Sequence, residues 1–408
     1  MYQNIAVLFA FTFVYSLVAG RLECTPIAGA IVFTAFGFAA GPFGLNLLTL
    51  DVHAQGLRAL AELTLALVLF TDAASADLRV LKLSYTIPER LLLIGLPVTI
   101  LLGIGVAALL FDGLGYVECA LLATMLAPTD AALGKAVVTN PAVPPPIREG
   151  LNVESGLNDG ICVPVLLILL ALAGEQTVAR GPLELVLHHF VQEIGIGLLV
   201  GAGLALLGLW ALRLADNYGW TTTVWRQLPA VALAFTSFAA AQALGGSGFI
   251  ACFVGGLAAG GMARRQKQKH EFLLAAEGAG DIFGLLTWVL LGSAVISQAT
   301  ERLSWEVAAY AVLSLTAIRM IPVWLALAGT GLTADSKLFM GWFGPRGLAS
   351  VVFAIIVLDA DLPGGETLTT TVAWTVILSI LAHGVTASPL AAIFARRVSA
   401  MQGTSLRR

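Results

Sequence analysis

The chain has 408 residues, of which 58% are hydrophobic and 12% are charged, and its formal net charge is −3. Soluble domains carry roughly 25% charged residues, so this composition excludes an ordinary soluble fold, and no nucleic-acid partner is expected. Apolar runs of about 17 to 25 residues fill nearly the whole chain and are joined by short connections. We therefore predict an all-α polytopic membrane protein without a soluble regulatory domain.

The first apolar run extends from about residue 5 to residue 19. No basic residue precedes it, and Arg21 follows it in place of a small-residue cleavage site, so we interpret it as a retained helix. Gly, Pro and charge clusters then divide the chain into about thirteen candidate helices. Their predicted ranges are 3–20, 26–41, 56–73, 91–111, 117–139, 147–173, 183–213, 228–244, 247–262, 271–297, 306–329, 336–358 and 367–394.

An odd number of helices places the two termini on opposite sides of the membrane. If the N-terminus is outside, the outer connections contain only Arg58, Arg180 and Arg302, and most of the 22 basic residues fall on the inner side. The positive-inside rule thus predicts an outer N-terminus and a cytoplasmic C-terminus in a prokaryotic plasma (inner) membrane. The basic run at 264–269 is expected to set topology and to contact anionic lipid.

Two of the predicted helices are interrupted. The fifth contains Pro128, Thr129 and Asp130, and the twelfth contains the run 344–347, Gly-Pro-Arg-Gly. Proline lacks an amide donor and clashes with the preceding turn, so both helices should kink or unwind there. The breaks correspond if helices 1–6 and 8–13 form two inverted repeats, a pattern that indicates a transporter site near the bilayer midplane.

Four buried charges are predicted to lie at a similar depth in the membrane. At a rise of about 1.5 Å per residue, each is about 15–20 Å from an end of its helix, in a hydrocarbon core about 30 Å thick. Ionisable residues at this depth usually have a function. These residues are Asp130, Asp159, Arg319 and Arg346.

The run 154–160, Glu-Ser-Gly-Leu-Asn-Asp-Gly, presents two polar faces if it is helical. Ser155 and Asp159 share one face, and Glu154 and Asn158 share a second face about 100° away. The first face offers hard oxygen ligands to a small monovalent cation. The second is suited to a structural role, in which Glu154 pairs with Arg319.

Asp159 is the expected carrier, because one carboxylate can bind either a proton or a cation and the two then compete for it. Thr129, Asp130 and carbonyl groups freed by the broken helix could complete a Na⁺ site with Ser155 and Asp159. Asp130 could also serve only to balance the partial charges of half-helix ends, and Arg346 is best explained by that compensating role.

The remaining polar residues have weaker interpretations. Asp72, Glu277 and Asp281 could line a cation funnel on the inner side, or they could be solvated residues near helix ends. The four cysteines and five histidines show no metal-ligand or disulfide spacing, so no cofactor is expected beyond the transported cation.

Four motifs in order along the chain resemble NhaP-type sodium/proton antiporters and the related eukaryotic sodium/proton exchangers. They are Thr129–Asp130 in a proline-containing fifth helix, the run 154–160, the segment 317–323 and the run 344–347. The resemblance covers essentially the whole chain. It implies an NhaA/NapA-like fold of two inverted six-helix repeats.

The resemblance also implies a homodimer whose core domain moves with the ion like an elevator. The core corresponds to about 91–173 and 306–394, and the dimerisation domain to about 1–73 and 183–297. Asn158 before the key aspartate implies electroneutral one-for-one exchange. The resemblance further implies that Asp159 binds the ion and the proton, together with Asp130, Ser155 and the Thr129 main chain. It also implies that Glu154 bridges to Arg319 and that Asn158 holds the unwound fifth helix.

Two departures from the family pattern stand out: Ala131–Ala132 follow Asp130 where many members have a proline, and no long tail follows the last predicted helix. The transported cation stays open between Na⁺ or Li⁺ and K⁺, because the same oxygens serve all three. A channel is disfavoured by the paired breaks. An intramembrane hydrolase using Ser155 would need a nearby base, and no histidine is expected at that depth, so we expect a secondary transporter rather than an enzyme.

Overall fold

The computed structural model describes residues 2–22, 25, 28–48, 55–76, 86–130, 133, 135–138, 140–174, 190–222, 224–262, 266–296, 299 and 302–405. Throughout these ranges the regular structure is helical, and no strand occurs among them. The predicted all-helical membrane fold is therefore confirmed.

The first part of the chain forms the elements up to the long helix that carries the run 154–160. They are α1 (Tyr2–Leu22), α2 (Gly29–Ala40), α3 (Gln55–Ser75), α5 (Thr86–Arg90), the π-helical turn η1 (Leu91–Gly95), α6 (Leu96–Leu110), α7 (Tyr116–Met125), α8 (Lys135–Val138) and α9 (Pro145–Gly174).

The second part continues with longer helices and two further π-helical turns. Its elements are η2 (Phe190–Ile194), α11 (Gly195–Asn217), α12 (Leu228–Ala243), α13 (Gly248–Met262), α14 (Gln266–Leu290), η3 (Leu291–Val295), α16 (Trp305–Leu315), α17 (Ala317–Ala326), α18 (Ala334–Trp342), α19 (Leu348–Asp359) and α20 (Gly365–Ser405).

Each predicted helix range contains one helix or consecutive helical segments, but three of the helices differ from their predicted ranges. The fourth begins earlier, at Thr86, because Pro88 lies in its first turn, where a missing amide donor is tolerated. The eleventh is divided at Thr316, whose φ of −114° and ψ of −94° are not helical. The last continues past residue 394 to Ser405, because Ala, Arg, Met and Gln favour helix.

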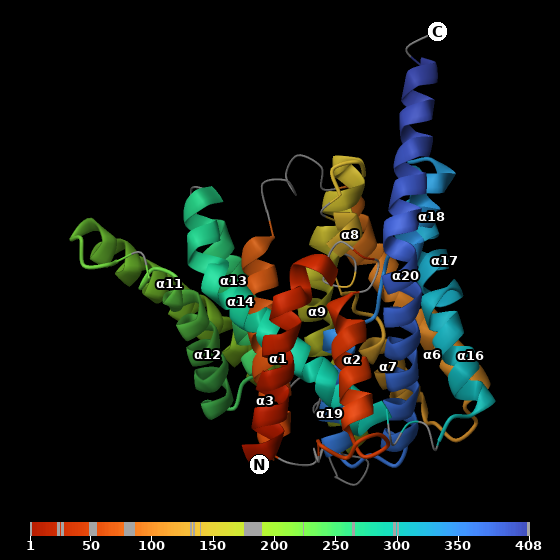
Figure 1. The fold of residues 1–408 in the computed structure, drawn as a ribbon, viewed down its shortest axis with the longest axis horizontal. Helices are drawn as coiled ribbons and strands as arrows, with labels where there is room; N and C mark the ends of the chain where they lie inside the picture. Colours follow the sequence, from red (N-terminus) through yellow and green to blue (C-terminus); the bar gives the residue numbers. More distant parts are fainter. Residues whose placement is uncertain are drawn as a thin grey trace.

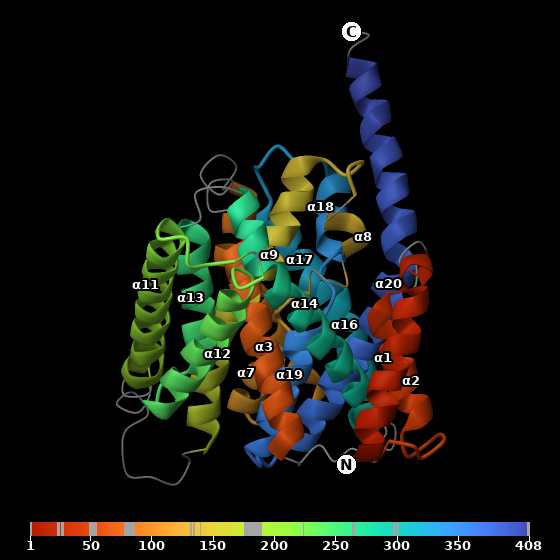
Figure 2. The same cartoon turned by 60° about the vertical axis from the view of Figure 1, so that its left-hand side comes forward.

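The helices form one bundle in which they pack mainly within two groups. One group contains α2, α3 and α11–α14, and the other contains α6, α7, α9 and α16–α20. Figure 1 shows α11–α12 and α16–α17 on opposite sides of the molecule, and in Figures 1 and 2 α20 projects beyond the bundle at the end opposite to the start of α1. Helices α3 and α19 contact each other and α9, and so connect the two groups.

Glycines allow the closest helix crossings. A β-carbon at Gly201 would overlap the backbone of Ala251, and one at Gly256 would overlap the backbone of Phe70. Small residues at such crossings let helix backbones approach closely, which is how membrane helices gain packing energy without a hydrophobic driving force between them.

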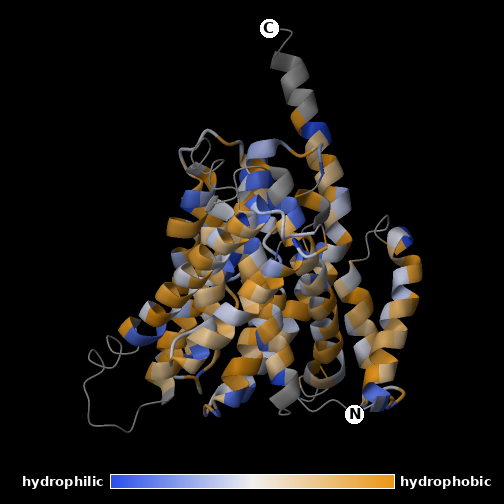
Figure 3. Cartoon of the chain, turned by 90° about the vertical axis from the view of Figure 1, so that its left-hand side faces the viewer, coloured by the Kyte–Doolittle hydropathy of each residue, from blue (hydrophilic) through white to orange (hydrophobic). Residues whose placement is uncertain are grey.

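The outer surface of the bundle is suited to lipid. Seven helical stretches in the described residues are long and apolar enough to cross a membrane, and several others are shorter apolar helices. Figure 3 shows hydrophobic colours over most helix surfaces, with hydrophilic residues gathered toward the ends and in the interior. The chain is therefore an integral membrane protein, while the number of spans stays a prediction.

Candidate functional site

Two broken helices cross at the centre of the second helix group. Helix α7 ends at Met125 and α8 begins at Lys135, whereas α18 ends at Trp342 and α19 begins at Leu348. Both breaks lie where the sequence predicts them, at Pro128 and Pro345. The amide of Asp130 donates a 2.8 Å hydrogen bond to the carbonyl of Pro345, so the backbones of the two breaks are bonded to each other.

Asp130 lies at the start of α19. Its carboxylate accepts a hydrogen bond from the amide of Leu348, the first residue of α19, at 3.1 Å, and another from Leu133 N at 3.4 Å. A β-carbon at Gly347 would overlap this carboxylate, so the glycine provides the room that the contact needs. The negative side chain therefore faces the positive end of a half-helix.

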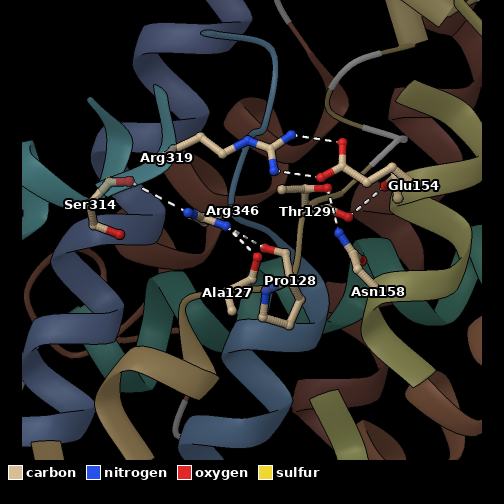
Figure 4. Close-up of polar contacts among 9 residues, drawn as sticks. Ala127, Pro128, Thr129, Glu154, Asn158, Ser314, Arg319 and Arg346 are labelled. Atoms are coloured by element: carbon tan, nitrogen blue, oxygen red, sulfur yellow. Dashed lines mark hydrogen bonds and ion pairs between the residues drawn. The ribbon is translucent and has the colours of Figure 1, made fainter. Parts of the chain in front are cut away.

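Arg346 makes the complementary contact at the end of α7. Its Nη1 donates to the carbonyl groups of Ala127 at 2.5 Å and Pro128 at 3.1 Å, and its Nη2 approaches Ser314 O at 3.5 Å. Figure 4 shows the guanidinium pointing at these carbonyl groups. The side chain is fully buried. It thus neutralises the carbonyl end of the opposite broken helix, the position in which its charge is most favourable.

Glu154 and Arg319 form a buried bidentate ion pair. Arg319 Nη1 is 2.5 Å from Glu154 Oε1, Nη2 is 2.7 Å from Oε2, and each side chain is only 2% exposed. A β-carbon at Gly344 would overlap the Arg319 guanidinium. The pair joins α9 to α17 beside the break in the twelfth predicted helix, as Figure 4 shows.

Two further side chains of α9 hold the break that follows α7. Ser155 Oγ donates to the carbonyl of Thr129 at 2.5 Å, and Asn158 Nδ2 donates to Thr129 Oγ1 at 2.7 Å. Thr129 is therefore bonded at both its main chain and its side chain. The break is held open by α9, and oxygen atoms of Ser155 and Thr129 lie next to each other.

Asp159 lies one helical turn beyond Ser155 and is 7% exposed. In the described part of the chain, its Oδ1 atom is buried and has no hydrogen-bond partner. The carboxylates of Asp72 and Asp130 are near enough to act on it electrostatically. Three acids with one open oxygen therefore create a locally negative site inside the bundle, which favours a cation or a proton.

A small cavity of about 10 Å³ lies at this point, which is close to the room needed for one water molecule. Thr129, Asp130 and Ser155 line it, whereas Asp159 does not. The structure thus brings three of the four predicted cation ligands to one cavity and leaves the fourth adjacent to it.

The predicted funnel residues lie near the end of α3 and in the middle of α14. Asp72 is half-buried, and a β-carbon on Gly156 would contact it at 3.6 Å, so it packs against the run 154–160. Glu277 and Asp281 are exposed on α14, and both act electrostatically on Asp72. Asp72 therefore lies between the exposed acids and the buried site.

His383 is the polar residue at this junction that sequence reasoning missed. It is fully buried in α20, and its ring contacts Ser379 and Trp342. The expectation that no histidine reaches the depth of the site overlooked this residue, although its ring contacts neither Ser155 nor any other residue of the run 154–160. The sequence does mark this position, because His383 is the one ionisable residue between Glu366 and Arg396.

Crossed broken helices whose ends face buried charges define a membrane transport protein. A family model described as sodium/hydrogen exchanger, transmembrane, matches residues 7–393. The chain therefore belongs to the sodium/hydrogen exchanger family, which confirms the resemblance to NhaP-type antiporters and excludes the hydrolase interpretation.

Individual relatives are similar to this chain over most of its length. The K⁺/H⁺ antiporter NhaP of Alkalimonas amylolytica is 27% identical over 391 residues, which are 95% of this chain and 65% of that protein. The K⁺/H⁺ antiporter NhaP2 of Shewanella sp. strain MR-4 is 24% identical over 380 residues, or 93% and 64%. The chain thus spans slightly less than two thirds of the length of these curated relatives.

A solved structure shares the fold. The sodium proton antiporter MjNhaP1 of Methanocaldococcus jannaschii at pH 8 superposes with a TM-score of 0.76 at 21% identity, covering 97% of each chain. At this identity, the similarity establishes the helical arrangement only.

Proposed function

We propose that this protein is a secondary antiporter that exchanges a monovalent cation, Na⁺ or Li⁺, for a proton. The family supports this class of activity, and the observation that carries it is the buried Asp159 carboxylate, whose open oxygen lies beside two crossed broken helices. A carboxylate can bind a proton or a cation at the same oxygen, so competition at one group couples the two fluxes without a second energy source.

The cation would be held by oxygen atoms of Asp159, Ser155, Thr129 and Asp130. Ser155 Oγ donates its proton to the Thr129 carbonyl, so its lone pairs stay available to a cation. Asp130 already accepts amide hydrogen bonds from Leu348 and Leu133, so it contributes mainly negative charge. Asp159 is the ligand that changes its protonation during the cycle.

We propose electroneutral one-for-one exchange, which the neutral side chain before Asp159 supports. The Asn158 amide is bonded to Thr129, so it fixes the break and brings no second titrating charge to the site. One carboxylate then carries either one cation or one proton in each direction, and no net charge crosses the membrane.

Alternating access would be of the elevator type. The packing of helices in two groups supports a core domain of about 91–173 and 306–394 that moves against a dimerisation domain of about 1–73 and 183–297. The two breaks and the Glu154–Arg319 pair all lie in the core, so the site would move as a unit. Helix α1 has no buried residue, which leaves its apolar surface for lipid or a second copy in a homodimer.

The inner-side acids are proposed as the entrance for the cation. Glu277 and Asp281 are exposed, and Asp72 is half-buried between them and Asp159. A row of acids of decreasing exposure raises the local cation concentration along the path. The orientation that makes this side cytoplasmic, with an outer N-terminus in a prokaryotic inner membrane, rests on the positive-inside rule.

K⁺ is the alternative substrate. The bacterial relatives are named as K⁺/H⁺ antiporters, whereas the archaeal structure is of a sodium proton antiporter. A panel of Na⁺, Li⁺ and K⁺ gradients in proteoliposomes that contain a pH-sensitive dye decides between them. A proton flux driven by K⁺ alone would replace Na⁺ as the proposed substrate.

The central test is Asp159→Asn in the same proteoliposomes. The amide keeps the size of the side chain but binds neither a proton nor a cation well, so exchange driven by an imposed gradient should be abolished. Asp112→Asn, at an exposed acid outside the site, is the matched control and should keep the wild-type rate. Undiminished exchange in Asp159→Asn would refute the proposal.

A further inference from the structure

A cavity outside the transport site lies among the ends of four helices. Its volume is about 440 Å³, within the range of roughly 300–1,000 Å³ found for pockets that hold small ligands. The last turns of α11 form one wall, and the ends of α3 and α13 and the first turns of α14 form the others. This end of the bundle is the one that the distribution of basic residues predicts to be cytoplasmic.

The cavity exists because α11 and α13 touch where they begin and separate where they end. A β-carbon at Gly197 would lie 3.0 Å from the β-carbon of Ile250, and one at Gly201 would overlap the backbone of Ala251. Toward its other end α11 leans away from α13, as Figure 1 shows. The space that opens between them is closed on a third side by Phe272 of α14.

Charged side chains of both signs line this cavity. Five of the lining residues are charged: Arg213 and Asp216 on α11, Arg226 after it, and Lys269 and Glu271 on α14. Arg226 Nε is 3.1 Å from Asp216 Oδ1, so these two charges balance each other. Two basic groups and one carboxylate remain, which suits a ligand that carries a negative and a positive group.

The Lys269 ammonium is held beside the cavity by the end of α3. Its Nζ atom donates to the carbonyl of Ser75 at 2.9 Å and to the carbonyl of Ala76 at 3.3 Å. Carbonyl groups at the end of a helix have no partner within the helix and carry partial negative charge, so they attract a cation. The side chain is half-buried, and its charge therefore stays at the cavity.

The apolar part of the lining adjoins the outer surface of α11. Leu209 and Leu212 line the cavity on the same helix face as Arg213, because residues three and four apart are neighbours. On the adjacent face, Leu207 and Trp210 are exposed. An acyl chain could therefore leave the cavity along α11 while its polar headgroup stays among the charges. A water-soluble ligand would gain nothing from this apolar path.

Aromatic side chains place the cavity at the membrane–water interface. Trp210 lies on α11, and Tyr218, Trp220 and Trp225 lie in the connection that follows it; all four are exposed. The rings of Tyr218 and Trp220 stack with their centroids 5.0 Å apart. Exposed Trp and Tyr residues concentrate at the level of lipid headgroups. The cavity thus lies at the depth at which a phospholipid presents its phosphate.

We propose that this cavity binds one phospholipid whose headgroup carries both a phosphate and an ammonium group, as in phosphatidylethanolamine. The phosphate lies between Arg213 and Lys269, the ammonium faces Glu271, and the acyl chains follow α11. A purely anionic headgroup would bring no positive group to Glu271 and is the poorer match. The bound lipid joins α11 to α14 and so stabilises this group of helices.

The test is thermal denaturation of delipidated protein in detergent with added lipid. Phosphatidylethanolamine should raise the apparent melting temperature by about 3 °C at about 100 times its Kd, and phosphatidylglycerol should raise it less. Native mass spectrometry should find one phosphatidylethanolamine retained per chain. Equal shifts with the two lipids would indicate general lipid contact and overturn the proposal. An equal shift with glycerophosphoethanolamine, the water-soluble headgroup, would overturn the assignment to a lipid.

Two variants test the headgroup contacts separately. Arg213→Gln should remove the shift caused by phosphatidylethanolamine, and Glu271→Gln should make phosphatidylglycerol at least as effective as phosphatidylethanolamine. Arg21→Gln is the matched control, because it removes an exposed basic residue from the last turn of α1, outside the cavity, and should keep the wild-type lipid preference. If Arg213→Gln does not fold, Glu271→Gln decides, and an unchanged preference in that variant overturns the proposal. No transport is measured, so this result is independent of the proposed antiport function.

Discussion

Removing Arg319 tests how the buried ion pair stabilises the site. Arg319→Ala leaves the Glu154 carboxylate in the interior without its partner, because both side chains are only 2% exposed and both carboxylate oxygens are bonded to the guanidinium. The variant should be much less stable than wild type, since an isolated buried charge loses its hydration and gains nothing in return.

The expected loss is about 3–5 kcal/mol, the range found when one partner of a buried pair is removed. The unfolding entropy of globular proteins is about 2.1 cal/mol/K per residue, which for 408 residues corresponds to about 0.9 kcal/mol per degree. The apparent melting temperature should therefore drop by about 4–6 °C.

The assay is thermal denaturation of purified protein in detergent, followed by size-exclusion chromatography of what remains folded. The decisive comparison is with Glu154→Gln/Arg319→Gln, which replaces both charges with a neutral pair and should lose less than Arg319→Ala alone. Arg226→Ala is the control, because the Arg226–Asp216 pair is about 40% exposed and should contribute less than about 1 kcal/mol. Equal losses in the single and double variants would refute the reasoning.

Three further predictions follow from the site. Competition at Asp159 should raise the apparent KM for the cation by up to about tenfold for each unit of decreasing pH, and a pH-independent KM would contradict a shared site. Electroneutral exchange should keep the same initial rate when the membrane potential is clamped at either sign, whereas a marked voltage dependence would indicate a second transported charge. Gly347→Ala should lower the free energy of unfolding in thermal denaturation by about 1–3 kcal/mol, because its methyl group would overlap Asp130. Gly105→Ala, which faces open space, should not destabilise, and equal losses would argue against the close contact.

Local sequence features determined much of the fold. Long apolar runs predict membrane helices because buried backbone groups need partners within the segment. Pro128 and Pro345 mark both breaks, because proline removes an amide donor. The sequence does not predict the distortion at Thr316, because the apolar pattern continues through it without a helix-breaking residue. It also does not predict the extension of α20 to Ser405, because no helix-breaking residue marks the end of that helix.

The sequence predicts the residues of the candidate site, but only some of their contacts. Helical spacing separates Ser155 and Asp159 from Glu154 and Asn158, because residues four apart share a face. Helical spacing does not show that the Ser155 hydroxyl donates a hydrogen bond to the Thr129 carbonyl. It also does not show that Asp159 lies beside the small cavity and does not line it.

The sequence by itself determined that this chain is a helical membrane protein with charges buried near two helix breaks, because hydropathy and proline act locally. The sequence also suggested Arg319 as the partner of Glu154, whereas tertiary structure alone decided which groups Arg346 and Asp130 contact. Arg319 meets Glu154 across 165 residues of chain, Arg346 meets Ala127 across 219, and Asp130 meets Leu348 across 218. Periodicity reports which residues share one face of one helix, whereas these contacts depend on which faces of different helices pack together.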